Sequence, residues 1–319
     1  MQVIDGATIN LSDYMSEPED VHKIRPASEW AQGVVDALYA RTTTPLVELG
    51  WEKCEGRFAF RTGELTIWGG INGHGKSMLT SQVALDLCLQ NQRVCIASLE
   101  MKPEKTMLRM VRQAAGDARP NAEFIRSMHS WTDDRLWLYD HTGSVKPAKM
   151  LAVVRYAVET YGIQHFLIDN LMKCVPGDDD YNGQKDFVNS LTAIAQDTGA
   201  HMHLIAHVKK GGSEYERPGK FDIKGSGSIT DLADNLFIVW RNKRKEAVGS
   251  EKLKLKRDEA DLVMGEPDCY LSIEKQRNGD YEGVFGFWFD VASMQYVEHR
   301  GQLPRKYPVD GAAVSLEDF

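Results

Sequence analysis

The stretch WGGINGHGKSMLTSQVALDLCL, from Trp68 to Leu89, is the most informative segment of this 319-residue chain. It contains four glycines, Gly69, Gly70, Gly73 and Gly75. Glycine is unfavourable inside a helix, yet these glycines directly precede a pattern that places Leu79, Val83 and Leu87 on one helical face. The strand-like run ELTIW comes just before them. The stretch therefore predicts a strand, a turn of bare backbone and a helix.

The turn GINGHGKS, residues 70–77, fits the P-loop pattern G-x-x-x-x-G-K-S/T. Gly70, Gly73 and Gly75 let backbone N–H groups surround phosphate oxygens, and the start of the helix adds positive potential. Lys76 is expected to reach the β- and γ-phosphates, and Ser77 to bind Mg²⁺. The expected cofactors are ATP, or another NTP, and Mg²⁺. The alternative is a glycine-rich turn that only caps a helix.

Two acidic residues complete this hypothesis. Asp169 ends the apolar run HFLID, and ligands of open α/β sheets collect at the carboxyl ends of strands. We expect Asp169 to be the second Mg²⁺ ligand. Glu100 ends the strand-like run after the P-loop helix, where a carboxylate could orient the attacking water. The alternative for each is an ordinary acidic residue at the end of a strand.

From Val47 to Val297 strand-like and helix-like runs alternate. The strand-like runs are ELTIWG, RVCIASLE, RLWLYD, QHFLID, HMHLIAH, NLFIVW, CYLSIEK and VFGFWFD, and helical patterns fall near 76–91, 103–116, 147–161 and 183–199. This alternation predicts an α/β fold with a mostly parallel central sheet flanked by helices. The last strands follow one another without a helix, which predicts an antiparallel edge.

The chain divides into three parts. Residues 1–45 form a polar lead and an amphipathic helix, SEWAQGVVDALYAR, with Trp30, Val34 and Leu38 on one face. This helix either folds back on its own domain or docks on a neighbouring subunit. Residues 46–300 form the ATPase domain. Residues 301–319, with Pro304 and Pro308, are predicted to be a disordered acidic tail.

Composition limits the function classes. With 42% hydrophobic and 26% charged residues and no long apolar run, the chain is expected to be globular and not inserted in a membrane. It shows no signal-peptide pattern, and its five cysteines are scattered, so we expect a cytoplasmic protein without disulfides or zinc. The net charge of −8 means that nucleic-acid binding needs a local basic patch.

Four further segments resemble the DnaB-like hexameric replicative helicases. They are SLEM (98–101), HLIAHVKK (203–210), GSGSITDLADNLFIVWRN (225–242) and IEKQRNGDYEGV (273–284). The histidine at 207, where many DnaB proteins have glutamine, is similar to the branch of phage primase-helicases and Twinkle. The resemblance spans about residues 46–297 and implies a RecA-like P-loop NTPase core. The family's primase and helical amino-terminal modules are not expected before this core.

The resemblance also implies residue roles. His207 would be a γ-phosphate sensor, whereas the alternative is a hydrogen-bonded core histidine. Lys275 and Arg277 would be a nucleotide-contacting lysine and an arginine finger. They are two apart in a strand-like run, so they share a face and suit a neighbour's phosphates; the alternative is a solvated basic edge. The implied protein is a homo-hexamer that hydrolyses NTP at subunit interfaces and unwinds DNA, with a separate primase or polymerase as a further partner.

A basic loop from 208 to 228 is the expected DNA-binding element. Its glycines and the cations Lys209, Lys210, Arg217, Lys220 and Lys224 suit the phosphates of single-stranded DNA. The alternative is a solvated flexible loop. A second basic run, 241–257, is interpreted as a polar hairpin insertion, and a DNA contact there is the weaker hypothesis.

Other interpretations stay open at this point. A RecA- or RadA-like recombinase shares the P-loop, the glutamate and the DNA loops. A regulatory or loader ATPase that acts on protein partners is a rival of another class. His201, His203 and His207 alternate along one strand-like run, but no cysteine or carboxylate joins them, so a metal site there is disfavoured. His74 is given no role.

Overall fold

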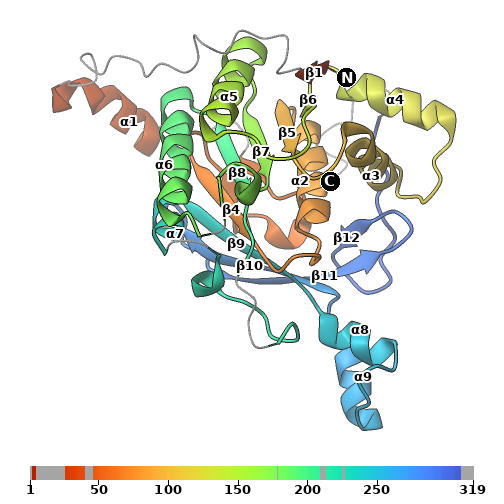
Figure 1. Ribbon diagram of the computed structural model, residues 1–319. Coiled ribbons are helices and arrows are strands. Elements are labelled where there is room, and N and C mark those ends of the chain that lie inside the picture. The colour runs from red at the N-terminus through yellow and green to blue at the C-terminus, as the bar shows by residue number, and fades with distance from the viewer. Residues whose placement is uncertain are drawn as a thin grey trace.

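The computed structural model describes residues 2–4, 26–39, 46–177, 179–208, 213–224 and 227–309. Within these ranges, ten strands form one sheet in the order β1-β6-β5-β7-β8-β4-β9-β10-β11-β12 (Figure 1). These strands are β1 Gln2–Ile4, β4 Leu65–Gly69, β5 Val94–Ser98, β6 Leu136–Tyr139, β7 His165–Asp169, β8 His201–Ile205, β9 Asn235–Arg241, β10 Cys269–Gln276, β11 Gly283–Asp290 and β12 Gln295–Val297. A short pair, β2 Val47–Glu48 and β3 Ala59–Phe60, precedes β4.

The helices lie between the strands. They are α1 Ala31–Tyr39, α2 Lys76–Leu89, α3 Pro103–Ala115, α4 Ala122–Thr132, α5 Pro147–Tyr161, α6 Tyr181–Thr198, α7 Gly227–Leu232, α8 Lys243–Gly249 and α9 Arg257–Gly265. Every strand-like run and every helical pattern expected between 65 and 290 forms the expected element. None of the described helices is long and apolar enough to cross a lipid bilayer.

The sheet has a parallel body and an antiparallel edge, as predicted. Each adjacent pair from β1 to β9 in the sheet order is parallel, and the pairs of β9, β10, β11 and β12 are antiparallel. The carboxyl ends of the parallel strands therefore meet at one edge. The P-loop follows β4 there, Glu100 comes shortly after β5, and Asp169 ends β7.

Helices cover both faces of the parallel strands (Figure 1). Side chains of α5, α6 and α7 pack with one set of strand residues, and those of α2, α3 and α4 pack with the other. Consecutive residues alternate between the two layers: Ile67 belongs to the first and Trp68 to the second, and neither is exposed. Double-sided burial explains why these strands are continuous apolar runs.

Helices α4, α7 and α9 were not expected from the sequence. Helix α4 buries Phe124 and Met128, which are four residues apart, and Asn121 caps it by accepting a hydrogen bond from the Phe124 N–H at 2.8 Å. The capping asparagine and this spacing were the available signal. The run 241–257, expected to form a polar hairpin, takes part in a helical pair: α8 and the start of α9 project together beyond β9 and β10 (Figure 1).

The prediction of a disordered tail is wrong for residues 301–309. Tyr307 and Val309 are buried, and the Tyr307 N–H donates to the Ala114 carbonyl at 2.8 Å. The Tyr307 hydroxyl and the Arg305 guanidinium both bind the buried carboxylate of Asp86. Prolines exclude regular elements here but do not prevent apolar and charged side chains from packing on α2 and α3. Residues 310–319 lie outside the described ranges.

Three histidines are stacked in the core at the amino-terminal ends of β7 and β8. Their rings are 4.7–5.6 Å apart, and His165, His201 and His203 are all buried. The Trp68 indole N–H donates to His203 Nδ1 at 3.3 Å, and His203 Nε2 lies 3.1 Å from His165 Nδ1. Each contact fits a neutral ring, and among the described residues no metal-binding group of His, Cys, Asp or Glu is found.

These imidazoles predict a loss of stability in mild acid. Burial lowers the pKa of His201 to about 4 and those of His165 and His203 well below 6.5. The unfolded chain therefore binds more protons, and the free energy of unfolding falls as pH drops below about 6.5, by up to ~1.4 kcal/mol per pH unit for each imidazole. Urea unfolding between pH 7.5 and 5 measures this slope.

The variant His201→Gln keeps a hydrogen-bonding side chain but removes one titrating group, so its slope should be shallower. A wild-type slope equal to that of His201→Gln would contradict the assignment.

Candidate active site

The P-loop forms a cradle between β4 and α2. Gly73 and Gly75 have φ angles of 79° and 86°, a left-handed conformation that glycine adopts without strain. A side chain at Gly70 would meet the Val239 carbonyl oxygen, whereas nothing lies within 4 Å of a Cβ placed on Gly73. Steric exclusion of a side chain therefore explains the glycine at 70, and the left-handed backbone conformation explains the glycines at 73 and 75. The open space beside Gly73 leaves room for a phosphate group.

Lys76 is the first residue of α2 and turns back over the loop. Its Nζ donates to the carbonyl oxygens of Gly70 at 2.8 Å and Ile71 at 3.0 Å, and lies 3.3 Å from His207 Nδ1. Burial lowers the pKa of Lys76 to about 8, and the nearby carboxylates of Asp169 and Glu100 oppose that shift. The ammonium group is therefore pre-positioned beside the cradle.

Asn170 links two predicted residues and was not singled out from the sequence. Its Nδ2 donates to Glu100 Oε1 at 2.7 Å and lies 3.0 Å from His207 Nε2. Glu100 is exposed, and Asn170 is buried. Contacts thus run continuously from Lys76 through His207 and Asn170 to Glu100. The only signal was the position of Asn170 directly after Asp169 at the end of β7.

Ser77 and Asp169, the predicted Mg²⁺ ligands, are brought together by the fold. The Asp169 side chain is hydrogen-bonded to Ser77, and the residue is 7% exposed. Burial raises the pKa of Asp169, and the Ser77 hydrogen bond and the Lys76 and Arg109 charges oppose this shift. One hydroxyl and one carboxylate suit Mg²⁺, a hard ion that takes oxygen ligands and keeps water and phosphate oxygens around it. The residues therefore fit the ion.

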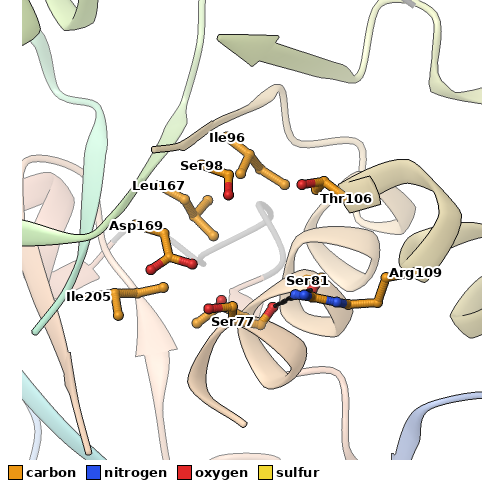
Figure 2. Close-up of a pocket in the computed structure, with 10 residues that line it drawn as sticks. Ser77, Ser81, Ile96, Ser98, Thr106, Arg109, Leu167, Asp169 and Ile205 are labelled. Carbon is orange, nitrogen blue, oxygen red and sulfur yellow. Dashed lines mark hydrogen bonds between the residues drawn. The ribbon is translucent and has the colours of Figure 1, made fainter. Parts of the chain in front are cut away.

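A pocket lies behind this pair, between α2, α3, β5 and β7. Figure 2 shows Ser77, Asp169 and Arg109 around it, with Ser98 and Thr106 on the opposite side. Arg109 was not singled out from the sequence, since an arginine on an amphipathic helix is usually solvated. Here its guanidinium reaches the first turn of α2 and donates to the Ser77 carbonyl oxygen at 2.8 Å.

Lys275 and Arg277 lie at the opposite end of the sheet from the P-loop. Lys275 is paired with Leu236, near the start of β9, whereas the P-loop follows the carboxyl end of β4. Lys275 Nζ donates to the carbonyl oxygens of Thr230, Asp231 and Ala233 at 2.6–3.1 Å. Arg277 pairs with Asp234 at 3.0 Å and donates to the Asp231 carbonyl at 3.0 Å. Both cations meet at one turn, although Arg277 follows the end of β10.

The basic loop is described only in part. Lys209 and Lys210 lie outside the described residues. Arg217 and Lys220 are exposed, and Lys224 is half-buried. The Lys224 N–H donates to the His207 carbonyl oxygen at 2.7 Å, and Val208 pairs with Ile223. The loop is thus joined directly to the predicted sensor.

His74 acts within the loop structure. The Arg241 backbone N–H donates to His74 Nδ1 at 3.2 Å, which ties the P-loop to the end of β9. Burial and the nearby cations Lys243, Lys76 and Arg241 lower the pKa of His74 to about 4. A neutral ring is required to accept this hydrogen bond.

The chain is similar in sequence to several known proteins. Residues 57–213 match the family model described as an AAA domain. The DNA helicase/primase of Enterobacteria phage T3 is 26% identical over 252 residues, which cover 68% of this chain and 44% of that protein. The chloroplastic/mitochondrial Twinkle homolog of Arabidopsis thaliana is 24% identical over 241 residues, covering 67% and 33%. The chain spans less than half the length of these relatives.

Solved structures share the fold. A DnaB-like replicative helicase, solved with its interactions with primase, superposes with a TM-score of 0.69 at 14% identity, covering 88% of this chain and 70% of that one. A solved ATPase domain gives a TM-score of 0.69 at 15% identity, covering 87% and 100%. The RecA-like fold and the resemblance to the DnaB-like helicases are therefore confirmed, and the relatives are named as enzymes of the predicted class.

Proposed function

We propose that this chain is the motor of an ATP-dependent, ring-shaped replicative DNA helicase, which moves along single-stranded DNA and unwinds duplex. The observation that carries the proposal is the connection of Lys76, His207, Asn170 and Glu100, together with the backbone bond from His207 to the basic loop. A nucleotide site joined to a cationic loop is what a DNA motor needs.

The proposed chemistry is hydrolysis of ATP or another NTP. The backbone of residues 70–75 and the Lys76 ammonium hold the phosphates, and Ser77 and Asp169 hold Mg²⁺. The ion supplies positive charge that neutralises the phosphate oxygens. Glu100, fixed by Asn170, orients the attacking water and accepts its proton.

His207 is proposed to transmit the state of the nucleotide to the loop. Its ring contacts Lys76 and Asn170, and its carbonyl oxygen accepts from the Lys224 N–H. When the γ-phosphate leaves, Lys76 and His207 lose a shared partner and rearrange. The bonded loop then shifts with them, and this movement carries the strand.

The position of Lys275 and Arg277 supports the proposal that a neighbouring subunit completes the site. The sheet separates Lys275 and Arg277 from the P-loop of their own chain. Both cations are anchored on the turn between α7 and β9, so they are presented as a fixed pair. We propose that they reach the nucleotide of the next subunit, which makes hydrolysis depend on ring closure. The proposed assembly is a homo-hexamer, and a separate primase or polymerase is its proposed partner.

Helix α1 is the proposed subunit-docking element. Trp30, just before it, and Leu38 and Tyr39 within it are 59%, 70% and 80% exposed. Deleting residues 1–45 is expected to convert the hexamer to smaller species, because this apolar surface would no longer cover its neighbour. Light scattering measures the mass. The exchange Gln32→Ala with Asp36→Ala changes polar positions of the helix as a control, and an intact hexamer after deletion would refute the role.

The basic loop predicts salt-dependent DNA binding. Replacing Lys220 and Lys224 by glutamine should weaken binding to single-stranded DNA and reduce the slope of log affinity against log salt by about 0.7 for each lost contact. Fluorescence anisotropy at several salt concentrations measures both. The same change at Lys102 and Lys105, before and within α3, is the control. If both double variants show the same slope of log affinity against log salt, the basic loop does not bind the DNA. A hydrolysis rate that single-stranded DNA does not change would favour an ATPase that acts on protein partners.

A further inference from the structure

Arg109 connects two segments of the site that are distant in the sequence. Its Nη1 donates to the Ser77 carbonyl oxygen at 2.8 Å and to Ser81 Oγ at 3.3 Å. Its Nη2 lies 2.9 Å from the sulfur of Met101. Ser77 lies in the first turn of α2 and is the proposed metal ligand, and Met101 directly follows Glu100. One guanidinium thus spans the metal ligand and the segment that carries the proposed base.

The contacts of this cation are not those of an ordinary ion pair. Arg109 is half-buried, and its hydrogen-bond acceptors are a carbonyl, a hydroxyl and a thioether. Asp169 is near enough to influence it electrostatically, yet among the described residues no ion pair joins the two. A charge withdrawn from water usually pairs with a carboxylate. The planar guanidinium can donate to several acceptors at once. This hydrogen-bonding geometry, rather than the pairing of its charge, explains why position 109 holds an arginine.

We infer that Arg109 is a positioning residue for the metal half of the site, acting through Ser77 and Met101. The inference rests on the proposed nucleotide hydrolysis. By holding the Ser77 carbonyl, Arg109 fixes the first turn of α2 and therefore the direction of the Ser77 hydroxyl toward Asp169. By holding Met101, it fixes the turn after β5 that presents Glu100. Residues that hydrogen-bond to metal ligands without touching the metal influence metal affinity strongly.

The adjoining pocket makes the inference testable by substitution. Ser98 and Thr106 line it with Arg109 (Figure 2). The Thr106 hydroxyl finds no hydrogen-bond partner among the residues that the structure describes. The hydroxyls of Ser81, Ser98 and Thr106 offer hydrogen-bond partners to a water that enters this pocket when the arginine is shortened. The helices α2 and α3 remain packed through Leu79, Val83, Met107 and Met110, so a variant at 109 is expected to fold.

The test compares Arg109→Gln with Arg109→Lys and with the control Arg112→Gln on the same helix. Mn²⁺ binding to the ADP complex is followed by electron paramagnetic resonance, and binding of a fluorescent nucleotide is measured in EDTA. Arg109→Gln should weaken Mn²⁺ binding about tenfold or more and lower kcat by about the same factor, with metal-free nucleotide binding unchanged. Lysine should recover part of the loss, because it can still reach the Ser77 carbonyl.

Two results would overturn the inference. Mn²⁺ affinity of Arg109→Gln within twofold of the control would show that Arg109 does not position the metal ligand. Equal weakening of metal-free nucleotide binding would indicate general damage to the P-loop. If the wild-type chain fails to bind Mn²⁺ with ADP at all, the proposed nucleotide site itself fails, and this inference fails with it.

Discussion

Replacing Lys76 by alanine is expected to abolish ATP hydrolysis. The ammonium group lies at the phosphate cradle, already oriented by the carbonyl oxygens of Gly70 and Ile71. Loss of one pre-positioned donor to developing charge typically costs about 10²–10³ in rate. A steady-state phosphate-release assay with Mg²⁺ and single-stranded DNA measures it.

The matched control is Lys105→Ala, which removes an exposed lysine of α3. Its activity should equal that of the wild type. The Lys76 variant should also retain the wild-type unfolding midpoint, since the hydrogen bonds of this lysine to described residues go to two loop carbonyls and His207 and to no core element. Hydrolysis at more than half of the wild-type rate would show that the glycine-rich turn is not a nucleotide site.

Replacing Arg277 by alanine is expected to remove hydrolysis while leaving nucleotide binding intact. An arginine supplied by a neighbour is often worth about 10³–10⁵ in rate because it stabilises charge on the transferred phosphoryl group. The P-loop of the same subunit is unchanged by this variant, since Arg277 contacts Asp231 and Asp234 at the far end of the sheet. Fluorescent-nucleotide titration and phosphate release measure the two effects separately.

Mixed assemblies distinguish action in trans from structural damage. Subunits with Arg277→Ala have an intact P-loop, and subunits with Lys76→Ala have an intact Arg277. Mixing the two inactive variants should therefore restore part of the activity at interfaces where the intact halves meet. Arg244→Ala, on the exposed side of α8, is the control and should stay active alone. Mixtures that remain inactive, or loss of nucleotide binding by Arg277→Ala, would remove the arginine-finger assignment.

The fold was predictable because apolar periodicity and chain order determine it. Runs such as ELTIWG and HFLID are buried on both faces, which is the pattern of a central parallel strand, and the absence of helices after β10 indicates the antiparallel edge. Residues of the P-loop were predictable for a related reason: a side chain at Gly70 would meet the Val239 carbonyl oxygen, and Gly73 and Gly75 adopt a left-handed conformation that favours glycine. Local sequence carries both kinds of information.

The remaining features depend on contacts between distant segments. Asn170 gains its role only because β5, β7 and β8 are neighbours, which places Glu100 and His207 on either side of its amide. In the sequence, Arg109 resembles any arginine of an amphipathic helix. Its contacts with the first turn of α2 arise only when α3 packs on α2. The prediction of disorder was wrong for residues 301–309 because it rested on the prolines of this segment. The packing of the segment depends instead on the buried carboxylate of Asp86, more than two hundred residues earlier in the chain.

Strand displacement on a forked DNA duplex with ATP and Mg²⁺, with Lys76→Ala measured beside the wild type, tests the proposed helicase activity most directly. The wild-type protein should release the displaced strand, and the variant should release none. Release by the variant would contradict the proposal. So would a wild-type protein that hydrolyses ATP in response to single-stranded DNA yet displaces no strand, because the cycle would then not drive unwinding, as in a recombinase-like filament.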